Sequence, residues 1–348
     1  MKRQFITIQN IRSIIENNEP QYLENLAQQA QQLTQQHFGR TISLYAPLYL
    51  ANFCSSYCTY CGFNARQPIH RFKLTPGQIQ KEMDYLAARG IENILLLTGE
   101  SYHATPLSYI KEAVQIAKTY FSSISIEIHP LEQGEYRQLF EAGVDGLTIY
   151  QETYNQSRYH EVHLSGKKKN YHYRRDAAKR AAQAGFRTIS LGILLGLHDD
   201  VAEDVFSLYQ HLHEMEQTFP GVEYSLSFPR LRSITGQEDL PPPISDKAFI
   251  KIICMTRGLF PRVGINLSTR ETPAIRDHAI ALGITRLSAE SNTSVGGYTL
   301  KNECQQAPQF DICDHRSVAE IITMLKKHKY DPVLTDWRRI DNICTERI

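Results

Sequence analysis

The sequence has almost no net charge and no long hydrophobic run. Its 38 lysine and arginine residues nearly balance 37 aspartate and glutamate residues, which gives a formal charge of +1. Such a chain lacks the field that attracts nucleic acid or anionic membranes. No stretch approaches the roughly 18 apolar residues of a membrane span, and MKRQFITIQNIRSIIENNEP lacks the apolar core and cleavage site of a signal peptide. We therefore expect a cytoplasmic protein that acts on small molecules and binds neither nucleic acid nor membranes.

Cysteine is scarce, but three of the seven cysteines lie close together, at Cys54, Cys58 and Cys61. An odd number of cysteines in a reducing compartment argues against a disulfide framework. The C-x3-C-x2-C spacing has one ligand too few for structural zinc, and no CxxC or HxxxH partner lies downstream. Three thiolates suit three corners of a [4Fe–4S] cluster and leave one iron open to a substrate or cofactor. The remaining cysteines are scattered and are predicted to be isolated thiols: Cys254, Cys304, Cys313 and Cys344.

Short apolar or β-branched runs recur eight times and are predicted to be strands. They are TISLYAPLYL, NILLLTG, SISIEIHP, GLTIYQET, TISLGILLG, EYSLSFP, GINLST and ITRLSAE. Helical patterns separate them. In one, Thr75 and Pro76 suit the N-cap and first turn and Gly90 suits the end; another ends at Gly185. Eight strand–helix repeats predict an α/β protein with a (β/α)8 TIM-type barrel, with a doubly wound open sheet as the alternative.

Two extensions flank the predicted barrel of residues 41–300. Residues 1–40 show the apolar spacing of two helices interrupted at Pro20. Residues 301–348 contain a helical pattern near SVAEIITMLKKHK and the only tryptophan, Trp337. We expect the N-terminal part to form a helical extension and the C-terminal part to pack back on the barrel.

Polar residues lie at the ends of most of the predicted strands. Because barrel active sites are built at the C-terminal ends of the strands, these residues are predicted to surround one site. They are the cysteine loop (residues 54–61), Thr98-Gly99-Glu100, Glu127 and His129, Gln151-Glu152, Arg230 and Arg232, Ser268-Thr269-Arg270, and Glu290-Ser291. The basic run Lys167, Lys168 and Lys169 is predicted to be a solvated loop, with a reductase-docking face as the alternative.

The cysteine spacing resembles that of the radical S-adenosylmethionine (SAM) superfamily. Together with LLLTGE, YQETY, LGILLGL, SFPRLR, LSTRE and SVGGY, the stretch LYAPLYLANFCSSYCTYCGF resembles the aromatic amino acid lyase branch, and most closely the tyrosine lyases of thiamine biosynthesis. The likeness extends from about residue 40 to Trp337. It implies a radical SAM lyase that cleaves the Cα–Cβ bond of L-tyrosine to 2-iminoacetate (dehydroglycine) and p-cresol, with 5′-deoxyadenosine and methionine formed from SAM, for thiazole formation.

The resemblance also implies a cofactor site. Cys54, Cys58 and Cys61 would hold a [4Fe–4S] cluster, and SAM would bind its open iron through its amino and carboxylate groups. Thr98, Gly99 and Glu100 would hold the SAM ammonium. Arg174, or its neighbour Arg175, would bind the SAM carboxylate, because a guanidinium reads a carboxylate in two bonds. The other predicted cofactor contacts are Tyr60, Glu127, Glu152, Gly192 and Ile193, of which Gly192 would admit the adenine to the backbone.

For the substrate, the resemblance implies an arginine that fixes the amino acid carboxylate. Arg230 is the first choice, and Ser268 would supply a hydroxyl to the same cavity. Arg270 would either contact the substrate or pair with Glu271 or Glu290. The phenol is expected to have a buried polar partner, and the sequence does not rank the candidates, which are Glu290, Tyr102, His103 and Tyr298.

The implied partners are a low-potential reductant of the flavodoxin or ferredoxin type and a complex with the thiazole synthase. Three alternatives stay open. A tryptophan lyase would share the motifs, because pocket residues choose the ring. The tyrosine lyase of [FeFe]-hydrogenase maturation carries an added C-terminal domain with its own cysteines. A non-catalytic iron–sulfur protein would leave Glu100, Arg174 and the glycines without a ligand to hold.

Overall fold

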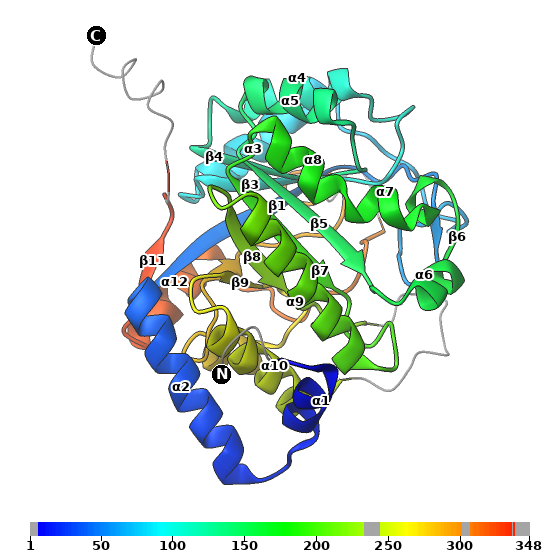
Figure 1. Cartoon of the computed structure of the whole chain (residues 1–348). Helices are drawn as coiled ribbons and strands as arrows, with labels where there is room; N and C mark the ends of the chain where they lie inside the picture. The colour runs from blue at the N-terminus through cyan, green and yellow to red at the C-terminus, as the bar shows by residue number, and fades with distance from the viewer. Residues whose placement is uncertain (1–5, 233–243, 301–306, 336, 338–348) are drawn as a thin grey trace.

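Eight parallel strands form a closed barrel in the computed structural model (Figure 1). The structure describes residues 6–232, 244–300, 307–335 and 337. The strands follow one another around the barrel in chain order, and it closes where Leu44 of the first strand lies opposite Leu287 of the last. The strands are β1 (Thr41–Ala51), β3 (Asn93–Thr98), β4 (Ser123–Glu127), β5 (Gly146–Glu152), β7 (Thr188–Ile193), β8 (Glu223–Ser227), β9 (Gly264–Leu267) and β10 (Arg286–Ser288). The closure confirms the predicted (β/α)8 barrel and excludes the open sheet.

Helices between the strands cover the outside of the barrel. The longer ones are α3 (Pro76–Ala87), α4 (Leu107–Ala117), α5 (Gln133–Ala142), α8 (Ala177–Ala184), α9 (Val201–Thr218), α10 (Asp246–Leu259) and α11 (Pro273–Ala279). The Thr75 side chain accepts a hydrogen bond from the Gln78 backbone N–H and so caps α3, as predicted. Gly185 ends α8 at a φ of 103°, a conformation that favours glycine. In the described part of the chain, no helix is both long enough and apolar enough to cross a bilayer.

The predicted pair of N-terminal helices is present as α1 (Ile8–Glu16) and α2 (Pro20–Phe38). Pro20 lies in the first turn of α2, where its missing N–H costs no hydrogen bond. Helix α1 packs on α9, and α2 packs on α10 (Figure 1). The two helices therefore cover one side of the barrel.

The C-terminal residues also contact the barrel. Helix α12 (Val318–Lys327) leads to β11 (Asp331–Val333), which pairs in parallel with the start of β1. The Trp337 ring lies 4.5 Å from the Arg187 guanidinium, just before β7. The chain thus returns to the N-terminal ends of the barrel strands.

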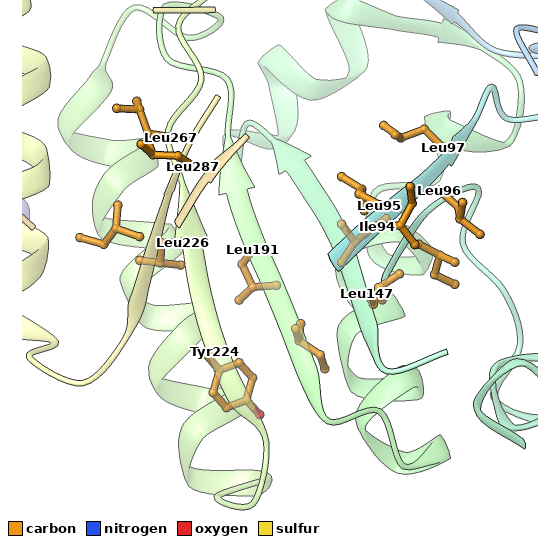
Figure 2. Close-up of a cluster of buried hydrophobic side chains, with 14 of the residues drawn as sticks. Ile94, Leu95, Leu96, Leu97, Leu147, Leu191, Tyr224, Leu226, Leu267 and Leu287 are labelled. Carbon is orange, nitrogen blue, oxygen red and sulfur yellow. The ribbon is translucent and has the colours of Figure 1, made fainter. Parts of the chain in front are cut away.

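The strands supply the apolar core. Figure 2 shows apolar side chains on several of them, including Leu96, Leu191 and Leu226, each of which is at most 1% exposed. Burying one such side chain stabilises the fold by about 1.5–3 kcal/mol. The barrel interior is more polar than the bulky, branched filling usual in this fold. There the Asn266 amide donates to the hydroxyls of Ser190, at 2.9 Å, and Ser225, at 3.1 Å.

Candidate active site

A cavity of about 910 Å³, part of it open to solvent, lies at the C-terminal ends of the strands; we call it the central cavity. Side chains from strands all around the barrel line it, as expected for a barrel active site. Six predicted site residues are among them: Tyr60, Cys61, Glu127, Glu152, Ser268 and Arg270. The structure therefore brings together residues that are more than 200 positions apart in the sequence.

The cysteine loop is held by the segment that follows β5. Two short strands, β2 (Tyr57–Cys58) and β6 (His163–Ser165), pair in antiparallel fashion and place Cys58 within a two-stranded ribbon. Gly166 follows at a φ of 85°, and a Cβ there would lie 2.5 Å from Ser56 Cα, so only glycine allows this approach. The Tyr60 hydroxyl and His163 Nε2 are 2.7 Å apart and join the two segments again. Contacts with residues 163–166 thus hold the cysteine loop in place.

The three cysteines fit an iron–sulfur cluster better than a single metal ion. Among the described residues, no three His, Cys, Asp or Glu side chains are grouped closely enough to hold one ion. A [4Fe–4S] cluster takes each thiolate on a different iron, so its ligand sulfurs lie farther apart than those around a single zinc. Burial raises the pKa of the Cys54 thiol to about 11. Thiolate ligation at this loop would therefore release protons.

The end of β3 presents buried acceptors that lack partners. Glu100 Oε1 accepts from Arg174 Nη1 at 2.6 Å, whereas Glu100 Oε2 and the Thr98 hydroxyl have no hydrogen-bond partner in the described part of the chain. A Cβ on Gly99 would lie 2.3 Å from the Phe53 carbonyl oxygen, so the glycine lets this strand end touch the cysteine loop. Unpaired oxygens beside the loop can accept hydrogen bonds from an ammonium group, so this set of acceptors fits SAM.

Two cations share the Glu152 carboxylate. Lys168 Nζ lies 2.8 Å from Glu152 Oε1, and Arg174 Nη2 lies 3.9 Å from the same oxygen. Burial raises the pKa of Glu152, but Lys168 and Arg174 outweigh burial and leave that pKa below its ordinary value. Glu152 also has a left-handed φ of 73°, which is rare for a residue with a side chain and recurs at functional sites.

The middle residue of the basic run corrects a prediction. Lys168 is not solvated: its side chain is only 11% exposed and lines the central cavity, whereas Lys167 and Lys169 are exposed. A single 3-10 turn, η2 (Lys167–Lys169), directs Lys168 inward. The sequence of three adjacent lysines does not indicate which of them faces inward.

The two adjacent arginines also point in different directions. Arg174 faces Glu100, whereas Arg175 binds Glu214 and the neighbouring Asp176.

Arg230 does not line the central cavity, contrary to its predicted contact with the substrate. Its Nε donates to Glu271 Oε1 at 3.0 Å, and its Nη1 donates to Asp246 Oδ1 at 2.7 Å. These carboxylates, together with the Ile244 carbonyl, occupy the guanidinium. Arg230 therefore forms the structural ion pair that was considered for Arg270.

Arg270 lines the central cavity and keeps its charge available. Its guanidinium lies 3.4 Å from the centre of the Phe310 ring, and in the described part of the chain it has no ion pair or side-chain hydrogen bond. The contact with the ring holds the guanidinium from one face and leaves its N–H edge unmatched. This edge can bind a carboxylate in two parallel hydrogen bonds.

The predicted adenine contacts lie in the barrel wall. A Cβ on Gly192 would lie 2.6 Å from the Tyr150 ring, so this glycine makes room for a neighbouring strand. Ile193 is fully buried, and neither residue lines the central cavity. The next residue, Leu194, does line it. Contact of Gly192 and Ile193 with a cofactor stays a prediction.

None of the phenol-partner candidates lines the central cavity: Glu290, Tyr102, His103 and Tyr298. Glu290 accepts hydrogen bonds from the Tyr85 hydroxyl and the Val318 backbone N–H, which orients α12. The Tyr298 hydroxyl donates to the Pro47 carbonyl at 2.6 Å. Both residues are thus engaged structurally. The hydroxyl groups that do line the cavity include those of Ser288, Ser291 and Thr293.

One wall comes from the segment after residue 306, which was predicted to be a C-terminal extension packed on the barrel. Gln309 and Phe310 line the central cavity. The Gly62 N–H donates to the Gln309 carbonyl at 3.1 Å, and a Cβ on Gly62 would lie only 2.5 Å from that oxygen. A glycine directly after the third cysteine is therefore the sequence signal of this close approach.

Glu127 is expected to make the stability of the cofactor-free protein depend on pH. Burial, then the nearby Glu152 carboxylate, raises the pKa of Glu127 to about 7 from 4.5, although Lys168, Arg174 and Arg270 oppose this. The folded state binds this proton more tightly than the unfolded state. The free energy of unfolding should therefore fall by up to about 3 kcal/mol as pH rises from about 4.5 to above 7. Urea unfolding at about pH 5 and about pH 8 measures the fall.

The matched variant is Glu127→Gln, which cannot ionise. Its unfolding free energy should depend less on pH than that of the wild type, and the difference between the two curves isolates Glu127 from other raised carboxyls such as Asp204. Parallel curves for the two proteins would show that Glu127 ionises normally in the fold.

The sequence matches two family models and several known proteins. The radical SAM superfamily matches residues 48–212, and the Biotin and Thiamin Synthesis associated domain matches residues 227–331. The 2-iminoacetate synthase of Salmonella typhimurium is 39% identical over 316 residues, which cover 91% of this chain and 83% of that protein. The 2-iminoacetate synthase of Escherichia coli is 38% identical over the same shares.

Solved structures show the same barrel. A crystal structure of HydG, a maturase of the [FeFe]-hydrogenase, has a TM-score of 0.89 and 29% identity, covering 95% of this chain and 73% of that one. HydG from Carboxydothermus hydrogenoformans has a TM-score of 0.87 and 31% identity, covering 95% and 76%. Barrel, cysteine loop and sequence match together define a radical SAM enzyme, a class that uses a [4Fe–4S] cluster and SAM. Within that class, the chain belongs to the 2-iminoacetate synthase family.

Proposed function

We propose that this protein cleaves the Cα–Cβ bond of L-tyrosine to 2-iminoacetate and p-cresol, converting SAM to 5′-deoxyadenosine and methionine, for thiazole formation in thiamine biosynthesis. The observation that carries the proposal is an unpaired arginine, Arg270, in the same cavity as Cys61. When bound, the cluster and SAM together supply a 5′-deoxyadenosyl radical. The protein's task is then to hold cofactor and amino acid in contact and keep water out.

The cysteine loop, the end of β3 and Arg174 form the proposed cofactor end of the cavity. Cys54, Cys58 and Cys61 hold the cluster, and the unpaired oxygens of Glu100 and Thr98 accept hydrogen bonds from the SAM ammonium. Arg174 takes the SAM carboxylate. It is already fixed by a 2.7 Å hydrogen bond from its Nε to the Tyr150 carbonyl, which leaves its terminal nitrogens directed toward the two glutamates. Tyr60, Glu127 and Glu152 face the remainder of the cofactor.

The substrate end is assigned to Arg270. Its free guanidinium edge binds the tyrosine carboxylate, and Ser268 adds a hydroxyl on the same wall. The aromatic ring of the substrate lies against apolar walls that include Tyr49 and Leu95. The hydroxyls of Ser288, Ser291 and Thr293, which also line the cavity, face the phenol. The arrangement fixes the carboxylate, so that the amino group and the Cα–Cβ bond face the cofactor.

A second candidate is the tyrosine lyase of hydrogenase maturation. It is favoured by the HydG structures, whose barrels superimpose with TM-scores of 0.89 and 0.87. This chain spans about three quarters of those proteins. The 2-iminoacetate synthases have a higher identity, and a larger share of their own length is matched, which favours the thiamine pathway. A low-potential flavodoxin or ferredoxin is the proposed electron donor, and the thiazole synthase is the proposed recipient of the product.

Anaerobic assays with single amino acids test the proposal. The protein is reconstituted with iron and sulfide and supplied with SAM, dithionite and either tyrosine or tryptophan. We expect p-cresol and 5′-deoxyadenosine from tyrosine, and no indolic product from tryptophan. Omitting SAM should abolish p-cresol. Indolic products alone would identify a tryptophan lyase, whereas a cluster spectrum that does not respond to SAM would identify a non-catalytic iron–sulfur protein.

A further inference from the structure

We infer that Gln309 donates a hydrogen bond to the sulfur of Cys61 and thereby raises the reduction potential of the cluster. This inference rests on the proposed cluster at Cys54, Cys58 and Cys61, and not on the identity of the amino acid substrate. Gln309 lies 248 positions from Cys61 in the sequence, beyond the last barrel strand. The sequence of the cysteine loop therefore gives no indication of this contact.

The contact is direct. Gln309 Nε2 lies 3.8 Å from Cys61 Sγ, within hydrogen-bonding reach of a sulfur acceptor. Within the described residues, no other side chain donates to any of the three sulfurs. Their other recorded donors are backbone N–H groups, such as that of Ser56, 3.4 Å from Cys54 Sγ. Gln309 is thus the contact that a side-chain substitution can remove without moving the loop backbone.

The amide is held in one orientation. The Tyr49 hydroxyl donates to Gln309 Oε1 at 2.7 Å, so the oxygen faces Tyr49 and the NH2 group faces the sulfur. The backbone of Gln309 is fixed at both groups, because its N–H donates to the Thr293 carbonyl at 3.0 Å and its carbonyl accepts from Gly62 at 3.1 Å. With its backbone held at two groups and its side chain at one, Gln309 loses little further freedom when its amide binds the sulfur.

The direction of the effect follows from charge. Reduction adds one electron to the cluster and makes no bond, so negative charge on the ligand sulfurs increases. A hydrogen bond to a sulfur stabilises the reduced state more than the oxidised state, and hydrogen bonds to the sulfurs are among the factors that set the potential of such clusters. Cys61 lines the central cavity, so water would reach its sulfur if Gln309 were absent. The Gln309 amide replaces this water with a hydrogen-bond donor in a fixed position.

The test is a potentiometric titration of the reconstituted protein, followed by the EPR signal of the reduced cluster, without SAM or tyrosine. Gln309→Met keeps the size of the side chain and removes the N–H, and its midpoint potential should be more negative than that of the wild type. Gln309→Glu retains an acceptor for Tyr49 but directs an oxygen at the sulfur, so its shift should be larger. The control is Gln151→Met, which removes a buried amide bound to the Tyr171 carbonyl and not to a sulfur. Its potential should not change.

The signal reports only molecules that carry a cluster, so partial loading of a variant does not obscure the result. A Gln309→Met potential equal to that of the wild type would overturn the inference. Equal negative shifts in Gln309→Met and Gln151→Met would also overturn it, since the effect would then be general. The p-cresol assay is independent of this titration, so failure of the substrate assignment leaves the inference on Gln309 open to its own test.

Discussion

Cys58→Ala should contain no stable [4Fe–4S] cluster and should form no p-cresol above background. Cys58 is buried within the ribbon, and the proposed cluster has only three protein ligands, so two thiolates would remain for four irons. Metal ligation and catalysis are then lost together. Iron and sulfide analysis and the visible absorption of the cluster measure the first loss, and p-cresol formation measures the second.

Cys313→Ser is the matched control for the loss of a thiol. Cys313 is exposed and outside the lining of the central cavity, so this variant should keep its iron, its spectrum and its activity. Full iron and sulfide content in Cys58→Ala would mean that another residue completes the site, and the three-cysteine assignment would be wrong.

Arg270→Lys should lower kcat/KM for tyrosine by about 30-fold or more. Loss of one partner from a buried, hydrogen-bonded charge pair costs about 2–5 kcal/mol, and each 1.4 kcal/mol is a factor of ten. Lysine keeps the charge but cannot form the two parallel hydrogen bonds of a guanidinium. Reductive cleavage of SAM without tyrosine should persist, because Arg174 and the cysteine loop are unchanged. Initial rates of p-cresol and of 5′-deoxyadenosine formation separate the two effects.

Arg230→Lys gives the comparison. Arg230 is held by Glu271 and Asp246 outside the cavity lining, so its replacement should reduce the free energy of unfolding and leave the KM for tyrosine unchanged. If instead Arg230→Lys raised that KM and Arg270→Lys did not, the carboxylate anchor would be Arg230, as the sequence motif indicates.

The fold was accessible from the sequence because its signals are local and repeated. Each strand reads as a short apolar run, and each helix carries its own start and stop, such as Thr75 before α3 and Gly185 after α8. Counting eight such units was enough to predict closure. The cysteine loop was equally visible, because its three thiols lie on one short stretch.

The direction in which individual side chains point could not be predicted from the sequence. Lys168 faces the cavity only because one 3-10 turn rotates it inward, and Arg230 turns away only because Asp246 and Glu271, from other elements, occupy it. Gln309 reaches Cys61 from beyond the last barrel strand. Each of these placements depends on contacts between residues far apart in the chain, which neither hydrophobic periodicity nor a short motif encodes.

The contact between Gly62 and Gln309 has a consequence for the stage of synthesis at which the protein can bind its iron–sulfur cluster. Cys61 is made early during translation, but Gln309 and Phe310, which form one wall of its cavity, are made after every barrel strand has been synthesised. Pairing of β1 with β10 imposes the same delay, because long-range pairing of this kind forms slowly. Iron and sulfur delivered to a nascent chain would therefore meet an incomplete pocket, and we expect the cluster to be inserted after these residues have been made.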